Sequence, residues 1–409
     1  MRDLLSQFAI SRWGFLPSPF SLYQLPEYTP LNFELNQLIK NMPRLIEQKR
    51  LREKVDQLNI LYRNEEIVLA NSLEEQTTIL ILLMLAQGYI CEDKEKPVRS
   101  IPAVLGNNIN RLCRHKNRYP TITYEDYVLN NWRLKNLKEG MVLDNIEPLY
   151  TFTGSKDEIW FIKIHVAIEA ICGRALIAAY RAYMLADDTS QMLLSAPEEA
   201  LLISYFVEVK QSLTDAINIM RRIEENCDPD YFWKSLRLYF QGWEGVAFEG
   251  LDNRQSSYHY RGPSGAQSSV VPALDAAFGI RHQFDEMYHM MLSLEFYMPS
   301  PHRAFIEFLK QSKIEKLVKL NPSKDLKSAF GEVISTIHLF RSAHLRVVET
   351  YIYKPARREG VKGLILGSGN TPASHFLGRR LLSTAEYGKR NGNVGSSQEP
   401  PPTSLRSSL

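Results

Sequence analysis

The stretch LKSAFGEVISTIHLFRSAHLRVVETYIY, residues 326–353, decides the fold class. Large apolar side chains recur in it at spacings of three and four, which is the period of a helix with one buried face. The residues of that face are Phe330, Val333, Ile337, Phe340, His344, Val347 and Tyr351. A stripe of this length predicts a long helix whose apolar side is covered by the rest of the protein.

Four further segments carry the same spacing and predict helices. They are residues 31–63, with a break or a new start at Pro43, and residues 72–87, 157–185 and 198–225. Alternating patterns typical of strands are scarce, and the candidates for short strands are residues 142–143 and 149–152. Neither a G-x-G-x-x-G motif nor a P-loop is present, which argues against a Rossmann fold. We therefore predict an all-α protein with little sheet.

The chain has 409 residues, which is long for one compact domain and suits two. Turn signals at residues 138–140 and 153–155 predict a boundary near residues 140–156. We expect a small helical domain over residues 1–150, a large helical domain over 151–388 and a disordered tail over 389–409. Two long irregular segments, residues 250–267 and 360–371, are of the kind that carries function.

Composition argues against several classes of protein. The 49 Lys and Arg residues nearly balance the 46 Asp and Glu residues, so nucleic-acid binding is not favoured, and the basic stretch 111–118 is more simply a solvated face. The longest apolar run, Ile79–Ala86, is far shorter than the roughly 20 residues that cross a bilayer. The four cysteines form no C-x-x-C pair, which argues against a disulfide scaffold, a thiolate zinc site and a covalently attached haem. We expect a cytoplasmic protein that binds neither membrane nor nucleic acid.

His344 is the polar member of the apolar stripe on residues 326–353. A histidine in a buried seam needs a hydrogen-bond partner or a metal ion, and the hydrogen-bonded core histidine is the commoner case. Arg341 lies one turn earlier and borders the same face. A cation at that place suits an anionic ligand beside a metal, such as a haem propionate.

Two other segments hold candidate pocket residues. His165 borders the apolar face of residues 157–185, and Glu169, one turn later, can pair with it on the surface. Small residues from Gly173 to Ala182 suit either tight helix packing or the close approach of a flat ligand. Arg237 lies among aromatic residues near Phe232, and an arginine in such a place can bind a carboxylate. A core helix with an arginine on its surface explains the same spacing as well.

Taken together, these stretches resemble the indoleamine 2,3-dioxygenase family over residues of about 100 to 385. The strongest likeness is in residues 262–269 (GPSGAQSS), 298–303 (MPSPHR) and 341–345 (RSAHL). Residues 124–132 (YEDYVLNNW), 232–245 (FWKSLRLYFQGWEG) and 278–280 (FGI) add to it. Independent segments in the right order make a chance match unlikely.

The resemblance implies an all-α fold in which a small N-terminal domain covers the distal pocket of a large haem-binding domain. It implies one non-covalent haem b, active in the ferrous form, with His344 as the proximal iron ligand and Arg341 near a propionate. Ser264 and Asp275 would also contact or orient the haem. The residues implied to bind substrate are Tyr124, Tyr127, Val128, Phe161, Phe232, Arg237, Ser264, Gly265 and Thr371.

The reaction implied is cleavage of the indole C2–C3 bond of L-tryptophan by O2, giving N-formylkynurenine, the first step of the kynurenine pathway. His165 stands where vertebrate members have Ser, and the related tryptophan 2,3-dioxygenases use a distal His to hydrogen-bond the indole N–H. We therefore expect a catalytic role for His165. Tyr127 and Trp233 are bulkier than their usual counterparts, which leaves another indole or aromatic substrate in secondary metabolism as an alternative. A haem-based sensor and a helical scaffold without haem are the non-enzyme alternatives, and we expect a monomer or weak oligomer.

Overall fold

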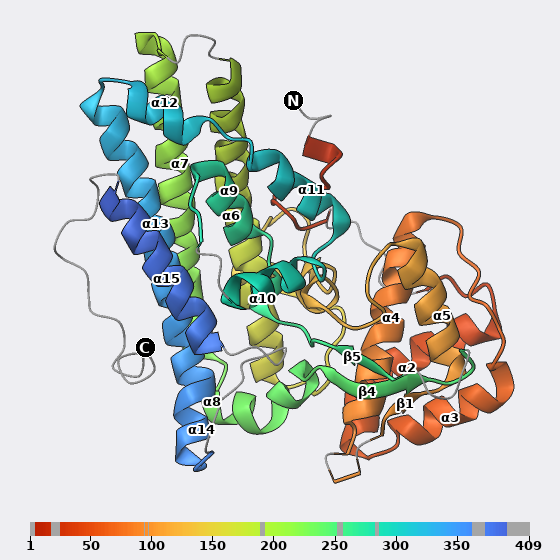
Figure 1. The fold of residues 1–409 in the computed structure, drawn as a ribbon. Coiled ribbons are helices and arrows are strands. Elements are labelled where there is room, and N and C mark those ends of the chain that lie inside the picture. The colour runs from red at the N-terminus through yellow and green to blue at the C-terminus, as the bar shows by residue number, and fades with distance from the viewer. Residues whose placement is uncertain are drawn as a thin grey trace.

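A computed structural model describes residues 5–17, 25–93, 95–96, 98–188, 193–251, 257–282, 286–361 and 373–390. Figure 1 shows long helices lying side by side on one side of the molecule and a smaller helical group on the other. The long helices are α6 (Lys156–Asp188), α7 (Ala196–Arg221), α13 (Lys324–Val348) and α15 (Ala373–Arg390). The smaller group consists of α2 (Pro30–Glu47), α3 (Leu51–Tyr62), α4 (Ser72–Cys91) and α5 (Ala103–His115). The prediction of an all-α fold is confirmed.

Shorter helices pack against the long ones. They are α8 (Pro229–Tyr231), α9 (Val270–Phe278), α10 (Glu286–Glu295), α11 (Ser300–Leu309), α12 (Ile314–Leu320) and α14 (Lys354–Arg358). Helix α13 contacts α7 on one side and α15 on another, and α6 contacts α7 and α9. On α13 the predicted stripe is buried at Phe330, Val333, Ile337 and Phe340, and a π-helical turn at Glu349–Tyr353 extends the helix to the end of the predicted segment.

The start and end signals of several helices act as the sequence indicates. Asn71 caps α4 by accepting hydrogen bonds from the N–H groups of Leu73 and Glu74, both at 3.0 Å, and Ser195 forms a capping box with Glu198 at the start of α7. The break predicted at Pro43 is wrong, because Pro43 lies inside α2. A proline removes one hydrogen bond, and burial of the apolar face of α2 outweighs that loss. The chain turns instead at Gln48–Arg50, where Lys49 has a φ of 55°.

Two small sheets add to the helices. Strand β1 (Ser100–Ile101) pairs in parallel with β4 (Trp243–Phe248), which pairs antiparallel with β5 (Tyr258–Tyr260). Strands β2 (Arg133–Leu134) and β3 (Ile146–Glu147) form an antiparallel pair. The strands expected at residues 142–143 and 149–152 are therefore wrong. Residues Leu143–Asn145 form a 3₁₀ turn instead, held by the Asn145 side chain, which donates to the carbonyl oxygens of Asn136 and Gly140.

Contacts between the two helical groups cross the expected boundary near residue 150. The N-terminal segment packs on α6, where a Cβ added at Gly173 would lie 2.3 Å from the backbone nitrogen of Gly14. Phe15 continues this contact by packing its ring 4.2 Å from that of His302. The small residues of α6 thus allow close packing of another segment, and only glycine fits at position 173. The division at residue 150 stays a prediction, and the tail beyond residue 390 lies outside the described residues.

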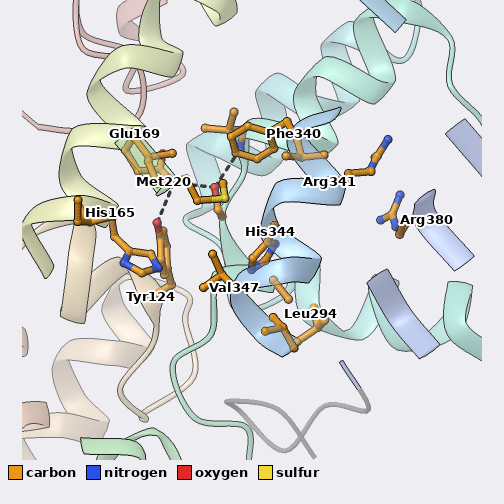
Figure 2. Close-up of a pocket in the computed structure, with 18 of the residues that line it drawn as sticks. Tyr124, His165, Glu169, Met220, Leu294, Phe340, Arg341, His344, Val347 and Arg380 are labelled. Carbon is orange, nitrogen blue, oxygen red and sulfur yellow. Dashed lines mark hydrogen bonds between the residues drawn. The ribbon is translucent and has the colours of Figure 1, made fainter. Parts of the chain in front are cut away.

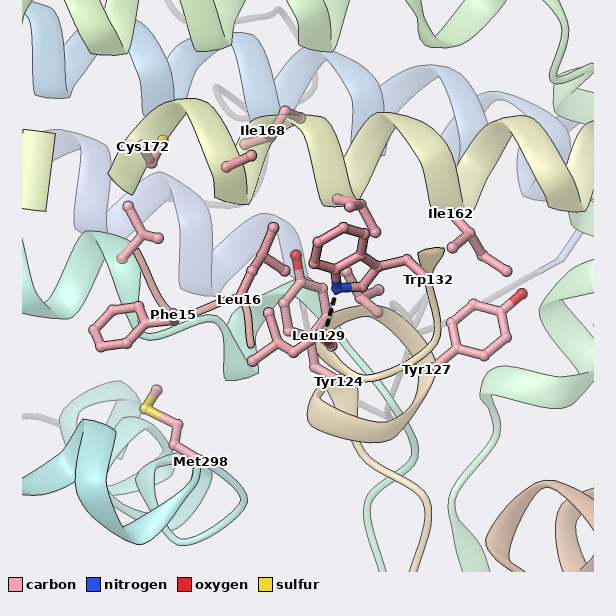
Figure 3. Packing of buried hydrophobic residues seen from close by; sticks show 14 of the residues in the cluster. Phe15, Leu16, Tyr124, Tyr127, Leu129, Trp132, Ile162, Ile168, Cys172 and Met298 are labelled. Atoms are coloured by element: carbon pink, nitrogen blue, oxygen red, sulfur yellow. Dashed lines mark hydrogen bonds between the residues drawn. The ribbon is translucent and has the colours of Figure 1, made fainter. Parts of the chain in front are cut away.

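The core joins the smaller helical group to α6. Figure 3 shows Trp132 between Leu129 and α6, with its indole N–H donating to the Leu129 carbonyl oxygen at 2.9 Å. The apolar run Ile79–Ala86 lies in α4 and is buried, so it serves as a core helix. Among the described residues, no helix is both long enough and apolar enough to span a membrane.

Candidate functional site

A large cavity opens between α6, α9, α10, α13 and α15. The space between these elements, with its open mouth and the adjoining solvent included, is about 1420 Å³. Most of its lining is apolar, and it brings two imidazoles together: His165 from α6 and His344 from α13 (Figure 2). Residues predicted for the site that line it are Tyr124, Phe161, His165, Phe232, Gly265, Arg341 and His344.

His344 has the chemistry of a metal ligand. None of the described residues hydrogen-bonds either of its ring nitrogens. Burial lowers the pKa of His344 to about 4, so the ring is neutral at pH 7. Neutral imidazole is the form that binds iron, because it offers a free lone pair. The spacing also allowed a hydrogen-bonded core histidine, but the described residues offer His344 no such partner.

His165 is held by its own helix. Its Nδ1 lies 2.8 Å from the carbonyl oxygen of Phe161. Because a carbonyl only accepts, the proton is on Nδ1, and Nε2 carries the lone pair. Burial lowers the pKa of His165, which keeps the ring neutral. The cavity is therefore lined by an imidazole able to accept a hydrogen bond.

Aromatic rings enclose His165. The Phe161 ring centroid lies 4.2 Å from that of His165, and Phe232 and Phe240 both lie 5.4 Å from Phe161. Tyr124 approaches His165 edge-on at 6.3 Å. This wall suits a flat aromatic molecule and keeps water from it.

Glu169 is a buried carboxyl on the cavity wall. Its Oε1 accepts hydrogen bonds from the Tyr124 hydroxyl at 3.0 Å and the Ser268 hydroxyl at 2.6 Å, as Figure 2 shows. Burial raises its pKa to about 7, with these two hydrogen bonds opposing. The surface pair with His165 that the spacing suggested is wrong, because both side chains turn into the protein and bond elsewhere.

Comparison with known proteins agrees with this geometry. A family model described as indoleamine 2,3-dioxygenase matches residues 4–372. The chain belongs to the indoleamine 2,3-dioxygenase family. This is a family of haem-dependent dioxygenases that act on indoles, and this protein is an oxidoreductase.

Relatives of this dioxygenase come from animals and fungi. Indoleamine 2,3-dioxygenase 1 of Rattus norvegicus is 28% identical over 397 residues, covering 92% of this chain and 93% of the relative. An indoleamine 2,3-dioxygenase of Penicillium citrinum is 29% identical, covering 92% of this chain and 87% of the relative. A protein of Haliotis madaka named myoglobin is 25% identical, covering 89% of this chain and 93% of the relative.

The residues of this dioxygenase fit a haem. His344 is neutral and lines the cavity, and none of the described residues hydrogen-bonds its ring nitrogens. Gly265 lies against this ring: a Cβ added there would make ordinary contact with His344 Nε2 at 3.8 Å, so a larger side chain would crowd the approach to that nitrogen. His344 would hold the iron, and the cation Arg341, which is buried and lines the cavity, would face a propionate.

Replacement of Gly265 by Leu is expected to weaken haem binding at least about tenfold, because a branched side chain would fill the approach to His344 Nε2. Gly265→Ala is the graded control, since its single Cβ makes only ordinary contact at 3.8 Å. Haem titration of the purified apoprotein, followed in the visible spectrum, gives both affinities. Equal affinities for the Leu variant and the wild type would contradict this view of the cavity.

Other predicted site residues lie near the cavity without lining it. They are Tyr127, Val128, Arg237, Ser264 and Asp275. Tyr127 points into the core, where its ring packs 5.0 Å from Phe240 and its hydroxyl donates to Glu158 at 2.9 Å (Figure 3). Its bulk therefore does not narrow the cavity. Thr371 lies outside the described residues.

Arg237 is held beside a tryptophan at the end of the aromatic wall. Its guanidinium lies 4.4 Å from the centroid of the Trp233 ring, whose N–H donates to Glu359 Oε2 at 2.6 Å. Asp228 caps the helical turn that leads to these residues, as the sequence suggests, by accepting from the Tyr231 N–H at 2.8 Å. Trp233 thus stacks on Arg237 outside the cavity instead of filling it.

Sequence reasoning missed several residues of the site. Ser268 was noticed only as part of the GPSGAQSS motif, and Arg380 of α15 and His282 were not noticed at all. Arg380 lines the cavity, although it is distant in sequence from the other lining residues. The amphipathic pattern of residues 373–390 was the one signal that could have drawn attention to it.

Proposed function

We propose that this protein is a haem b enzyme that cleaves the C2–C3 bond of L-tryptophan with O2 to give N-formylkynurenine. The observation that supports the proposal is that a neutral His344 and a hydrogen-bond-accepting His165 line one aromatic-walled cavity. When bound, the haem supplies the activation of O2. The protein binds and orients the reactants and excludes water.

His165 would orient the indole. With its proton on Nδ1, its Nε2 accepts a hydrogen bond from the indole N–H, which fixes how the ring lies over the haem. Phe161 and Tyr124 would pack against the ring, and Phe232 would close the outer side of the site. Ser264 and Gly265 belong to the segment that would cover the haem, with Tyr127 and Val128 supporting the deeper wall. Thr371 would also contact the substrate.

Arg237 would bind the carboxylate of the amino acid. We expect Arg237→Gln to raise the Kd of L-tryptophan about 10- to 100-fold, because a charge-assisted hydrogen bond is lost. The Kd of tryptamine, which has no carboxylate, should stay the same. Both values follow from the ligand-induced change in the visible spectrum, with Lys234→Gln as the neighbouring control. An equal increase in the Kd of L-tryptophan and of tryptamine would show that Arg237 has a structural role instead.

The test of the proposed function is to load the protein with haem, reduce it, add L-tryptophan and air, and measure products by mass. N-formylkynurenine is the expected product. The protein could instead bind haem, form no N-formylkynurenine and oxidise another indole that is supplied. That result would favour the alternative substrate class in secondary metabolism. A reversible O2 complex that tryptophan does not affect would favour an oxygen-binding role, which the relative named myoglobin suggests.

The setting of the reaction is proposed with it. A tryptophan-cleaving enzyme of this kind would supply the kynurenine pathway in the cytoplasm and would work as a monomer or weak oligomer. Size-exclusion chromatography of the haem-loaded protein with light scattering tests the oligomeric state, and a stable dimer or tetramer would contradict it.

A further inference from the structure

A cluster of buried charges lies at the end of the cavity away from His165. Asp275 of α9 is at its centre, and its Oδ2 accepts from Arg341 Nη2 at 2.5 Å, His282 Nε2 at 2.8 Å and Arg380 Nη1 at 3.2 Å. These contacts join three helices, because Arg341 belongs to α13 and Arg380 to α15. Figure 2 shows Arg341 and Arg380 together, on the far side of His344 from His165 and Tyr124.

The charges in this cluster are unequal. Burial opposes ionisation of Asp275, but Arg341 and His282 hold its pKa at about 2, so it carries a full negative charge. Burial lowers the pKa of His282, and its Nε2 donates to Asp275, so the ring is neutral. Two guanidiniums therefore donate to one oxygen of one carboxylate.

Both cations face the cavity. Arg341 and Arg380 line it, and so does Glu295. Burial raises the pKa of Glu295, and the positive charges of Lys310 and Arg380 oppose this rise. Arg341 lies one helical turn from His344 on α13. Both cations would therefore be placed to hold the carboxylates of a haem whose iron His344 binds.

Helix α15 is fixed to the cluster at two further points. The Thr384 hydroxyl, one turn after Arg380, accepts from Arg341 Nη1 and donates to the Arg380 carbonyl oxygen at 2.8 Å. The Tyr387 hydroxyl donates to the Phe278 carbonyl oxygen at 2.8 Å. These contacts turn one face of α15 toward α13 and set the position from which Arg380 reaches the cavity.

We propose that Arg380 is a second cation for the carboxylates of the bound haem, beside Arg341, so that the C-terminal helix α15 is part of the cofactor site. Asp275 orients both guanidiniums through its shared oxygen. The inference rests on the proposed function only in that the cavity takes up haem. It adds that the charge at the propionate end comes from two helices instead of one.

The experiment compares Arg380→Gln with Arg379→Gln in the full chain. Arg379 is the adjacent residue of α15, and its side chain is exposed, so the pair differs in position and not in the charge removed. We expect Arg380→Gln to speed transfer of haem to excess apomyoglobin at least about tenfold, as the loss of a charge-assisted hydrogen bond implies. The haem reduction potential should become more negative, because a nearby positive charge favours the ferrous form. Arg379→Gln should change neither.

Arg380→Lys guards against a folding defect. This variant keeps the positive charge but loses the forked geometry of the guanidinium. Its rate of haem transfer should therefore lie between those of the wild type and Arg380→Gln, and its haem reduction potential should stay close to that of the wild type. Melting of the apoproteins shows whether a variant is folded. Unchanged transfer and potential in folded Arg380→Gln, or the same change in Arg379→Gln, would overturn the inference. Wild type that takes up no haem would reject the proposed function itself, which is a distinguishable outcome.

Discussion

His344→Ala is expected to purify with less than about a tenth of the haem of the wild type and to lose at least about 99% of its activity. His344 would hold the iron through its imidazole, and the apolar wall of the cavity cannot replace that bond. Pyridine haemochromogen spectra of equal amounts of protein measure the haem content, and product assays measure activity.

His338→Ala is the matched control for this variant. His338 lies on the same helix, is partly buried and has a pKa lowered to about 4 by burial, but it does not line the cavity. We expect it to keep its haem. Imidazole added to His344→Ala should restore part of the Soret band by filling the vacated position. Full haem retention in His344→Ala would refute its role as iron ligand.

His165→Ala is expected to lower kcat/KM for L-tryptophan about 10- to 100-fold, because the hydrogen bond that orients the indole is lost. In the wild type, N1-methyltryptophan should be a poorer substrate by a similar factor, since its ring has no N–H to donate. Both decreases in kcat/KM come from loss of the same hydrogen bond. In His165→Ala, tryptophan and N1-methyltryptophan should therefore have similar kcat/KM values.

The four kcat/KM values of this cycle, two proteins by two substrates, make the test specific. A general disturbance of the cavity would lower kcat/KM for both substrates in His165→Ala. The ratio of the two kcat/KM values would then be the same as in the wild type. Equal turnover of tryptophan and N1-methyltryptophan by the wild type would refute the role of His165. Haem content, measured in the same samples, separates substrate orientation from cofactor loss.

Much of the fold was predictable because helices are local structures. The spacing on residues 326–353, the cap at Asn71 and the capping box at Ser195 each depend on neighbours within a few positions, and they were read correctly. Pro43 was misjudged because packing of a whole helix face outweighs one lost hydrogen bond. The strands were misplaced because two-residue strands have too little sequence for a pattern to develop.

The site was predictable only in part. His344 stood out because it is a polar residue within an apolar stripe. The spacing of the stripe does not show whether a hydrogen-bond partner lies opposite its ring. Glu169 looked like a surface residue because its bonds to Tyr124 and Ser268 come from distant segments. The same holds for Arg380, whose contact with Asp275 spans 105 residues.

The sequence by itself determined the helical class, the family and the histidine that faces the core, since periodicity and motifs are written along the chain. The tertiary structure alone decided that no described residue hydrogen-bonds the imidazole of His344, that His165 exposes an acceptor nitrogen and that a second arginine reaches the same cavity. These properties depend on distances between atoms of different helices and on the removal of water around them. Neither exists until the helices have packed.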